Sequence, residues 1–256
     1  MFLPRYSAGE KSCRGTRRGE CLFLGSSFDT NDATRSALES VAFAAWTAAS
    51  TVARVKRSEV VSDQDGWETV STVEHFANAH IEVLTDSVRT PLHSKPRSWT
   101  IAHRKAAVVV APMTRDNKFV LIRQERIPIR VAIWEMPSGQ IDQGDADDKE
   151  IRHVALRELR EEAGYELAPG GELIALGYFF SSPGFTDEHC YFFLARPVEP
   201  CRDYKRGEGE SIADCQPFTA EQVRQMIAEN EIRDANTLGI CARLAARGFI
   251  WRERAD

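Results

Sequence analysis

Three glutamates lie close together in the stretch RELREEAGY, residues 157–165. On an α-helix, which turns by about 100° per residue, Glu158 and Glu162 stack on one face and Glu161 lies beside them. Hard divalent cations such as Mg²⁺ take oxygen ligands and are often held by one or two carboxylates together with a substrate phosphate. A bound cation would relieve the repulsion among these side chains, so the spacing indicates a metal site.

The same glutamates would also suit a solvated acidic face, on which Arg157 and Arg160 supply the ion-pair partners. Charge alone favours this second interpretation. The flanking sequence reverses the preference, because Gly164 ends the helix and an acidic loop with Gly139 and Gly144 precedes it.

The spacing of apolar residues predicts the elements that must position these side chains. A helix is expected over residues 148–163, with Leu156, Leu159 and Ala163 facing a core. Alternating or uninterrupted apolar runs predict strands over residues 67–76, 80–90, 106–113, 119–127, 134–142, 172–180 and 189–198. A capping-box pattern at Thr219 indicates the start of a later helix.

The string R-E-L-x-E-E-x-G resembles the second half of the Nudix box, G-x5-E-x7-R-E-U-x-E-E-x-G-U with U apolar. The first half departs from that pattern. If Gly139 opens the box, Asp145 stands in place of the glutamate, and eleven residues instead of seven separate it from Arg157. If Gly144 and Glu150 serve instead, the spacing is one residue too short. Loop insertions cost little free energy, so such a departure is tolerated. Because neither alternative fits the pattern, we assign no role to Asp145 or Glu150.

Four further segments resemble the ADP-ribose pyrophosphatase branch of the Nudix family, in the expected order around the box. They are LIRQERIP (121–128), WEMPSGQID (134–142), SSPGFTDE (181–188) and EIRDANTLGI (231–240). Each segment alone is a weak signal, whereas four in order are specific. The resemblance runs from about Trp67 to the C-terminus. It implies an α/β Nudix fold, an α/β/α sandwich with a mixed sheet, plus a small N-terminal antiparallel β region.

The resemblance implies Mg²⁺ as cofactor, with Mn²⁺ as a substitute. Glu158 and Glu162 would be direct ligands, Glu161 would assist them, and the backbone carbonyl of Ser138 would be a further ligand. A metal at this place neutralises a diphosphate and orients it for attack by water. Arg157 would orient the glutamates, and the alternative for it is an ordinary helix ion pair.

A general base is implied on a loop after the box, in a G-x-G-E-like setting. The segment KRGEGES, residues 205–211, places Glu210 there, with Glu208 as the reserve. Glycines on both sides would let such a loop close over substrate. The alternative is a surface loop whose charge is incidental.

Substrate contacts are expected from basic and aromatic side chains. Arg126 would hold a phosphate through bidentate hydrogen bonds, and Arg104 is a weaker candidate for the same task. Trp67 and Trp99 are candidates to stack on adenine, with simple packing as the alternative for each. The wall near the terminal ribose is assigned to Pro183, Gly184 and Phe185.

Composition limits the other classes of function. The 256 residues are 43% hydrophobic and 28% charged, and a net charge of −5 offers no general attraction for nucleic acid or an anionic membrane. No apolar run approaches the roughly 20 residues of a membrane span. Six cysteines without a C-x-x-C pair suggest neither a zinc site nor a disulfide framework, and they favour a reducing, intracellular setting.

The chain is predicted to comprise an extension and one domain. Residues 1–62 would be a partly disordered extension with an Ala-rich helix over residues 33–57. Residues 63–256 would form the Nudix domain, with a β region over 63–104 and a catalytic core over 105–256. Two glutamates in the first 20 residues argue against a transit peptide, so we expect a cytoplasmic protein, with organelle targeting by the extension as the alternative.

The predicted activity is metal-dependent hydrolysis of ADP-ribose to AMP and ribose 5-phosphate. Relatives in the branch are homodimers, in which Trp67 and Trp99 of one subunit would complete the site of the other. One alternative keeps the chemistry and changes the substrate to a UDP-sugar, GDP-mannose or another ADP-sugar. The other is a Nudix-fold sensor that binds ADP-ribose without cleaving it. Sensors usually lose box glutamates and add a DNA-binding domain, and here the glutamates are intact.

Overall fold

The computed structural model describes residues 60–142, 147–204 and 211–251, so the helix expected over residues 33–57 lies outside the described residues. The elements in order are β1 (Glu68–Ala77), β2 (Ile81–Thr90), β3 (His93–Arg104), β4 (Ala107–Thr114), β5 (Lys118–Arg126), η1 (Ile127–Ile129), β6 (Val131–Glu135), β7 (Ser138–Gln140), α2 (Asp148–Glu158), η2 (Leu159–Ala163), β8 (Tyr165–Phe180), β9 (His189–Pro200), β10 (Ile212–Thr219), α3 (Ala220–Ala228) and α4 (Ala235–Ala246). None of the helices in these ranges is long and apolar enough to span a membrane.

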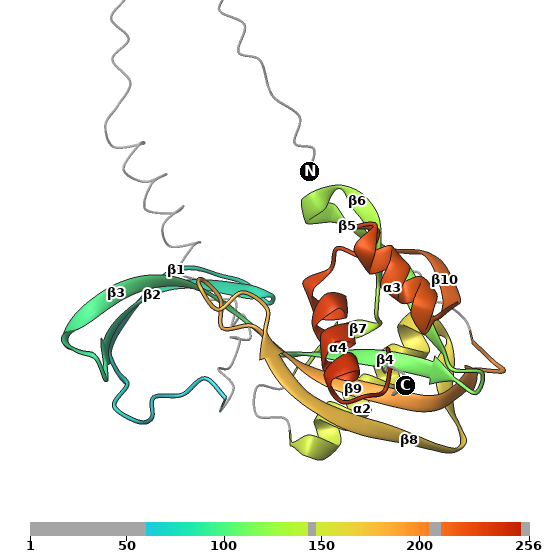
Figure 1. Cartoon of the computed structure of the whole chain (residues 1–256). Coiled ribbons are helices and arrows are strands. Elements are labelled where there is room, and N and C mark those ends of the chain that lie inside the picture. The colour runs from blue at the N-terminus through green and yellow to red at the C-terminus, as the bar shows by residue number, and fades with distance from the viewer. Residues whose placement is uncertain (1–59, 143–146, 205–210, 252–256) are drawn as a thin grey trace, which may run out of the picture. The chain divides into compact units, whose positions relative to one another are not determined.

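The first three strands form a separate antiparallel sheet in the order β1-β2-β3 (Figure 1). The turn between β1 and β2 is set by Asn78, whose side-chain oxygen accepts hydrogen bonds from the backbone N–H groups of His80 and Ile81. Strand β3 was not predicted, because its sequence is polar and contains Pro96. Proline is tolerated here because β3 is an edge strand. The predicted N-terminal antiparallel β region is confirmed.

The second sheet is mixed and has the order β10-β5-β4-β9-β8, with β6 paired to β5 and β7 paired to β4. Strands β4 and β9 run parallel, and the other pairs are antiparallel. Strand β10 was also missed by the sequence pattern, because it is short and contains Pro217. It lies at the end of the main strand order, where a missing N–H is tolerated.

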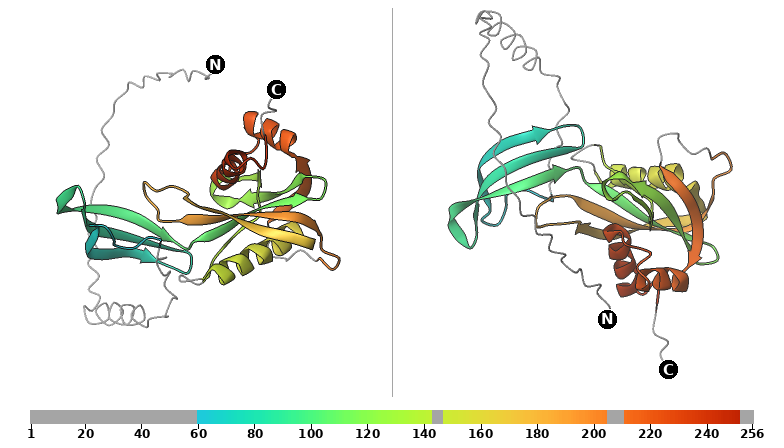
Figure 2. Two further views of the ribbon diagram at one scale, coloured as in Figure 1. Left: turned by 60° about the horizontal axis from the view of Figure 1, so that its bottom comes forward. Right: turned by 90° about the horizontal axis from the view of Figure 1, so that it is seen from above.

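Helices cover both faces of this sheet (Figures 1 and 2). Alternate side chains of β4 point to opposite faces, as the two-residue period of a strand requires. Val108 and Val110 join a buried cluster with Ile151, Val154 and Leu159 from α2 and η2. Val109 and Ala111 join a second cluster with Val223, Ile240 and Leu244 from α3 and α4. The predicted α/β/α sandwich with a mixed sheet is therefore confirmed.

Candidate active site

The box helix is positioned by its two ends. At its start, the Asp147 side chain accepts a hydrogen bond from the backbone N–H of Glu150 at 2.8 Å, which caps α2. The helix predicted over residues 148–163 is present, but its last turn, η2, is a π-helical turn. Gly164 ends it at φ 72°, a left-handed conformation that suits glycine. Single π-helical turns inside helices occur frequently at functional sites.

The glutamates of this helix differ in burial. Glu158 is 7% exposed and Glu162 is 4% exposed, whereas half of the Glu161 side chain is exposed. Arg157 reaches two of them: its Nη2 lies 2.7 Å from Oε1 of Glu158 and its Nη1 lies 3.0 Å from Oε2 of Glu161. The arginine therefore pairs with glutamates, as the solvated-face interpretation expected, but Glu158 and Glu162 lie in the protein and not in water.

A short strip of chain, Met136–Gly139, leads from β6 into β7, and its last two residues contact the two buried glutamates. The backbone N–H of Ser138 donates to Oε2 of Glu162 at 2.7 Å. A Cβ atom on Gly139 would lie 2.0 Å from Cδ of Glu158, so only glycine fits there. Gly139 therefore touches the box helix as the opening glycine of the box should, whereas Gly144 lies outside the described residues.

The donor set at this place fits a hard divalent cation. Two buried carboxylates meet the start of β7, Glu162 at Ser138 and Glu158 at Gly139, and oxygen is the ligand atom that Mg²⁺ prefers. Within the described ranges, no three His, Cys, Asp or Glu side chains form a cluster that could hold a metal. A cation here would thus depend on backbone and substrate oxygens as well, which is the usual way in which Mg²⁺ is bound.

An arginine–carboxylate pair joins the neighbouring strands β5 and β6. Arg126 Nε donates to Oε1 of Glu135 at 2.9 Å, and its Nη2 donates to Oε2. Burial raises the pKa of Glu135, and the hydrogen bond from Arg126 opposes that rise. The same bond is the main cause that raises the pKa of Arg126, and the charges of Asp234 and Glu162 add to it.

The C-terminal segment supports the strip from the other side. Asp234 caps α4, accepting from the backbone N–H of Thr237 at 2.7 Å and from its hydroxyl at 2.8 Å. The Thr237 hydroxyl oxygen in turn accepts from the backbone N–H of Met136 at 2.9 Å, and Thr237 is fully buried. The sequence resemblance pointed to this segment without assigning these roles.

The candidate base Glu210 and its reserve Glu208 both lie in residues 205–210, which are outside the described part of the chain. Both flanking residues contact the site. The Tyr204 hydroxyl donates to the backbone oxygen of Glu161 at 3.0 Å, and a Cβ on Gly164 would lie 2.7 Å from the tyrosine ring. On the other side, the Ser211 carbonyl accepts from the backbone N–H of Glu125, the neighbour of Arg126, at 2.8 Å.

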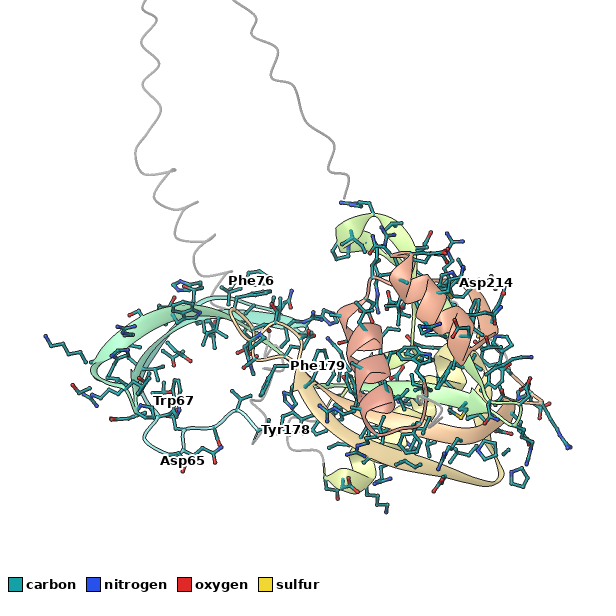
Figure 3. All side chains as sticks on the ribbon, in the orientation of Figure 1. Asp65, Trp67, Phe76, Tyr178, Phe179 and Asp214 are labelled. Atoms are coloured by element: carbon teal, nitrogen blue, oxygen red, sulfur yellow. The ribbon has the colours of Figure 1, made fainter. Side chains whose placement is uncertain are left out.

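A cavity of about 790 Å³ gathers several of the predicted substrate residues. Trp67, Trp99, Pro183 and Phe185 line it, and Figure 3 shows Trp67 close to Asp65 at the turn that leads into β1. The indole N–H of Trp99 donates to the carbonyl of Gly184 at 3.0 Å, which joins the SSPGFTDE segment to β3. Among the described residues, neither Glu158 nor Glu162 lines this cavity.

Arg104 lies at the junction of β3 and the SSPGFTDE segment. Its Nη1 lies 3.1 Å from Oε1 of Glu188, and its backbone N–H donates to Asp187 at 3.1 Å. The neighbouring His103 is buried and contacts the same aspartate through Nδ1. The predicted phosphate role of Arg104 therefore competes with an ion pair inside the protein.

Comparison with known proteins identifies a matching family and several relatives. The model of the NUDIX domain matches residues 103–238, more than half of the chain. The methanol dehydrogenase activator of Bacillus methanolicus is 30% identical over 67% of this chain and 88% of the relative. The ADP-ribose pyrophosphatase of Bacillus subtilis is 28% identical over 66% of this chain and 88% of the relative. The GDP-mannose pyrophosphatase of Klebsiella pneumoniae is 31% identical over 56% and 72%.

A solved structure titled "Crystal structure of ADP compounds hydrolase" has the same fold, with a TM-score of 0.58 at 16% identity, over 74% of this chain and all of that one. The family match and the relatives show that the chain belongs to the Nudix family and is a Nudix pyrophosphohydrolase. Within that family it is of the ADP-ribose pyrophosphatase-like branch.

Proposed function

We propose that this enzyme hydrolyses the diphosphate of ADP-ribose, with one water molecule, to AMP and ribose 5-phosphate. The observation that carries the proposal is the burial of Glu158 and Glu162 against Ser138 and Gly139, with a guanidinium nearby. This arrangement offers oxygen ligands to a metal ion, and it offers a fixed guanidinium group to a doubly charged diphosphate. Relatives named for ADP-ribose and GDP-mannose hydrolysis support this class of substrate.

Mg²⁺, or Mn²⁺ in its place, would be held by Glu158, Glu162 and the backbone carbonyl of Ser138, with Glu161 assisting. When bound, it supplies charge neutralisation and orients the diphosphate. Arg157 orients the glutamates by bonding both Glu158 and Glu161. Their oxygens are thus set in place before substrate arrives, which lowers the cost of organising the transition state.

Arg126 would bind a phosphate oxygen through the N–H groups that Glu135 does not use. We assign the general base to Glu210, with Glu208 as the alternative. The contacts of Tyr204 with Glu161 and of Ser211 with Glu125 support this assignment, because they hold one flanking residue on the box helix and the other beside the neighbour of Arg126. A base must come within hydrogen-bond reach of the attacking water, directly or through one further water.

The aromatic cavity would take the adenine between Trp67 and Trp99, with Pro183, Gly184 and Phe185 near the terminal ribose. Stacking on indole rings suits a planar base. Among the described residues, the cavity lining does not include the box glutamates of the same chain. We therefore propose a cytoplasmic homodimer in which the cavity of one subunit faces the metal site of the other.

The test is a chromatographic assay of ADP-ribose, UDP-glucose, GDP-mannose, diadenosine polyphosphates and NADH, each with Mg²⁺ and with EDTA. AMP formed fastest from ADP-ribose, and only with metal, is the expected result. Faster cleavage of a UDP- or GDP-sugar would keep the chemistry and overturn the substrate. If no compound is cleaved while ADP-ribose raises the melting temperature, the chain is a sensor and not an enzyme.

A further inference from the structure

The SSPGFTDE segment, which joins β8 to β9, is paired with the end of β3. The backbone N–H of Ala102 donates to the carbonyl of Phe185 at 2.8 Å, and Ala102 and Thr186 form an isolated parallel bridge. Strand β3 lies at the edge of the small sheet, so its outer side is open to such a pairing. The segment therefore extends the small sheet and is held against it.

Trp99, a predicted stacking residue for adenine, takes its orientation from this segment. It is 63% exposed, so packing restrains its ring little. Its indole N–H donates to the carbonyl of Gly184 at 3.0 Å. Trp99 lines the aromatic cavity, as do three residues of the segment, Pro183, Phe185 and Asp187. The direction of the indole ring in the cavity therefore depends on the place of Gly184 along β3.

The backbone contacts of the segment leave its register on β3 weakly defined. Among the described residues, this backbone pairing consists of the Ala102–Phe185 hydrogen bond and the Ala102–Thr186 bridge. Register is strongly specified where one face of a strand is buried, and the pairing here is too short for that. A shift by one residue would take the Gly184 carbonyl away from the indole of Trp99, so a further contact must define the register.

Asp187 supplies this further contact. Its side chain is 9% exposed, and its two oxygens engage consecutive residues of β3. Oδ1 accepts from the backbone N–H of Arg104 at 3.1 Å, and Oδ2 contacts Nδ1 of His103, which is 2% exposed. Because one carboxylate engages two neighbouring residues at once, it fits a single register.

A second buried carboxylate lies on the far side of His103. Glu82 is directly opposite His103 in the pairing of β2 with β3, and it too is buried. Buried polar groups therefore follow one another from β2 through β3 to Asp187 in the segment. An apolar row of similar volume is often equally stable, whereas a satisfied polar row specifies one arrangement.

We propose that Asp187 is a positioning residue for the base of the substrate. It fixes the register of the SSPGFTDE segment on β3, which places the Gly184 carbonyl and so holds the stacking face of Trp99 in the cavity. This inference rests on the proposed function, in which the cavity takes adenine. The effect acts through the indole N–H, so it must disappear when Trp99 is replaced by a ring without that donor.

The experiment measures the binding of AMP by isothermal titration calorimetry in the absence of metal, so that it does not depend on hydrolysis. Four proteins are compared: wild type, Asp187→Asn, Trp99→Phe and the double variant. Asparagine keeps the side-chain volume, but its amide NH₂ replaces one acceptor, so it cannot accept from both His103 and Arg104. Asp116→Asn is the matched control, because Asp116 accepts from the Thr114 hydroxyl at 2.6 Å and does not line the cavity.

The dissociation constant for AMP should rise about tenfold in Asp187→Asn, which corresponds to the loss of one good aromatic contact. Removing a negative charge would by itself favour an anion, so weaker binding is opposite to the effect of charge. The double variant should bind AMP as Trp99→Phe does, because the two changes break the same chain of contacts. In the hydrolysis of ADP-ribose, KM should rise while kcat stays close to the wild-type value.

His103→Gln is a milder variant that removes the Nδ1 contact and keeps the bond from Arg104. It should raise the dissociation constant by a smaller factor, and it carries the test if Asp187→Asn does not fold. Unchanged AMP binding in these variants, a further tenfold loss in the double variant, or a wild type that binds no AMP overturns the inference. Wild-type protein that binds AMP but cleaves no ADP-ribose would refute the proposed function and leave this inference standing.

Discussion

The two buried glutamates of the box helix are each fixed by a different kind of contact. Glu162 accepts a backbone hydrogen bond from Ser138, whereas Glu158 is confined between the bare backbone of Gly139 and the guanidinium of Arg157. The contacts with Ser138 and Gly139 involve backbone, and Arg157 is itself held by a second bond to Glu161. The ligand oxygens therefore have little freedom to lose when a cation and a diphosphate bind.

Replacing the buried glutamates should affect catalysis much more than replacing their exposed neighbour. Glu158→Gln and Glu162→Gln should each lower kcat/KM for the preferred substrate by at least about 100-fold, because a direct ligand matters more than the groups that support it. Glu161→Gln should cost clearly less, since half of its side chain is exposed. Steady-state kinetics at saturating Mg²⁺ measures the difference.

The melting temperature separates this effect from unfolding. The glutamine variants keep the volume of the side chains, so they should melt near the wild-type temperature. Equal losses of activity in all three variants would show that burial does not mark the direct ligands.

At the scale of elements, α4 is tied to the strip between β6 and β7 by one hydroxyl. Thr237→Val leaves the N–H of Met136 buried without its acceptor, which costs about 1–3 kcal/mol. For a chain of this size each kcal/mol lowers the melting temperature by roughly 2–4 °C. Calorimetry should show a drop of this size.

Thr237→Ser is the matched control, because it keeps the hydroxyl and loses only a methyl group. It should melt at a temperature between that of Thr237→Val and that of the wild type. If the valine variant is as stable as the wild type, the hydroxyl does not hold these two elements together.

The π-helical turn η2 is joined to the segment after β9 by the hydroxyl of Tyr204. Tyr204→Phe removes the hydrogen bond to Glu161 and keeps the ring on Gly164. The net loss in stability should be small, about 0.5–1.5 kcal/mol, as for one ordinary hydrogen bond. The rise in activation free energy, calculated from the fall in kcat, should be larger than this loss in the free energy of unfolding. The reason is that Glu161 and Glu162 lie in the turn that the bond supports.

Rapid-quench kinetics with Mg²⁺ would measure the chemical step directly. A Tyr204→Phe enzyme with unchanged kcat would show that the hydroxyl serves stability alone. Tyr204→Leu, which also removes the ring, should lose more in both stability and kcat.

Sequence reasoning located the elements whose signals are local. The box helix follows from its glycine and from Leu159 and Ala163, which face the core as predicted, whereas Leu156 is exposed and that part of the prediction is wrong. The strands around β4 follow from uninterrupted apolar runs. The π-helical turn was not foreseen, because the residue types of Leu159–Ala163 suit an ordinary α-helix equally well, and the hydroxyl that bonds it, that of Tyr204, lies 43 residues away in the chain. Strands β3 and β10 were missed because each contains a proline that only an edge position makes acceptable.

The functional site was predicted only in part, because some of its contacts leave no local signal in the sequence. The spacing of three glutamates was enough to propose ligands, but the sequence did not tell which of them are buried. The pairing of Glu135 depends on a partner nine residues away on a neighbouring strand, and the bond from Trp99 to Gly184 spans 85 residues. Such contacts are set by the register of strands, which no single stretch of sequence determines.

At the scale of the whole molecule, the proposed homodimer makes a prediction about mixtures of inactive variants. Trp99→Ala damages the cavity and Glu162→Gln damages the metal site. If the two halves come from different subunits, each mixed dimer contains one intact site. Random reassociation of equal amounts should then restore about one quarter of the wild-type activity, because half of the dimers are mixed and each has one of two sites.

Analytical ultracentrifugation must first show a dimer, and the mixture must be unfolded and refolded together so that subunits exchange. A mixture as inactive as its components would mean that cavity and metal site are supplied by the same subunit. The unmixed variants, refolded separately, are the control.

Helix α2 also has a consequence for how this chain can change in evolution. Relative to the Nudix pattern the chain carries four extra residues between Gly139 and Arg157, in the loop before α2 or at the start of the helix, and four residues make about one turn of α-helix. The helix begins at a cap supplied by its own chain, Asp147, so a turn added there leaves the glutamates on the same face. One residue gained or lost between Glu158 and Glu162 would instead turn these two side chains onto different faces of the helix. Lineages are therefore free to lengthen this helix where it begins, while its other end must keep its length.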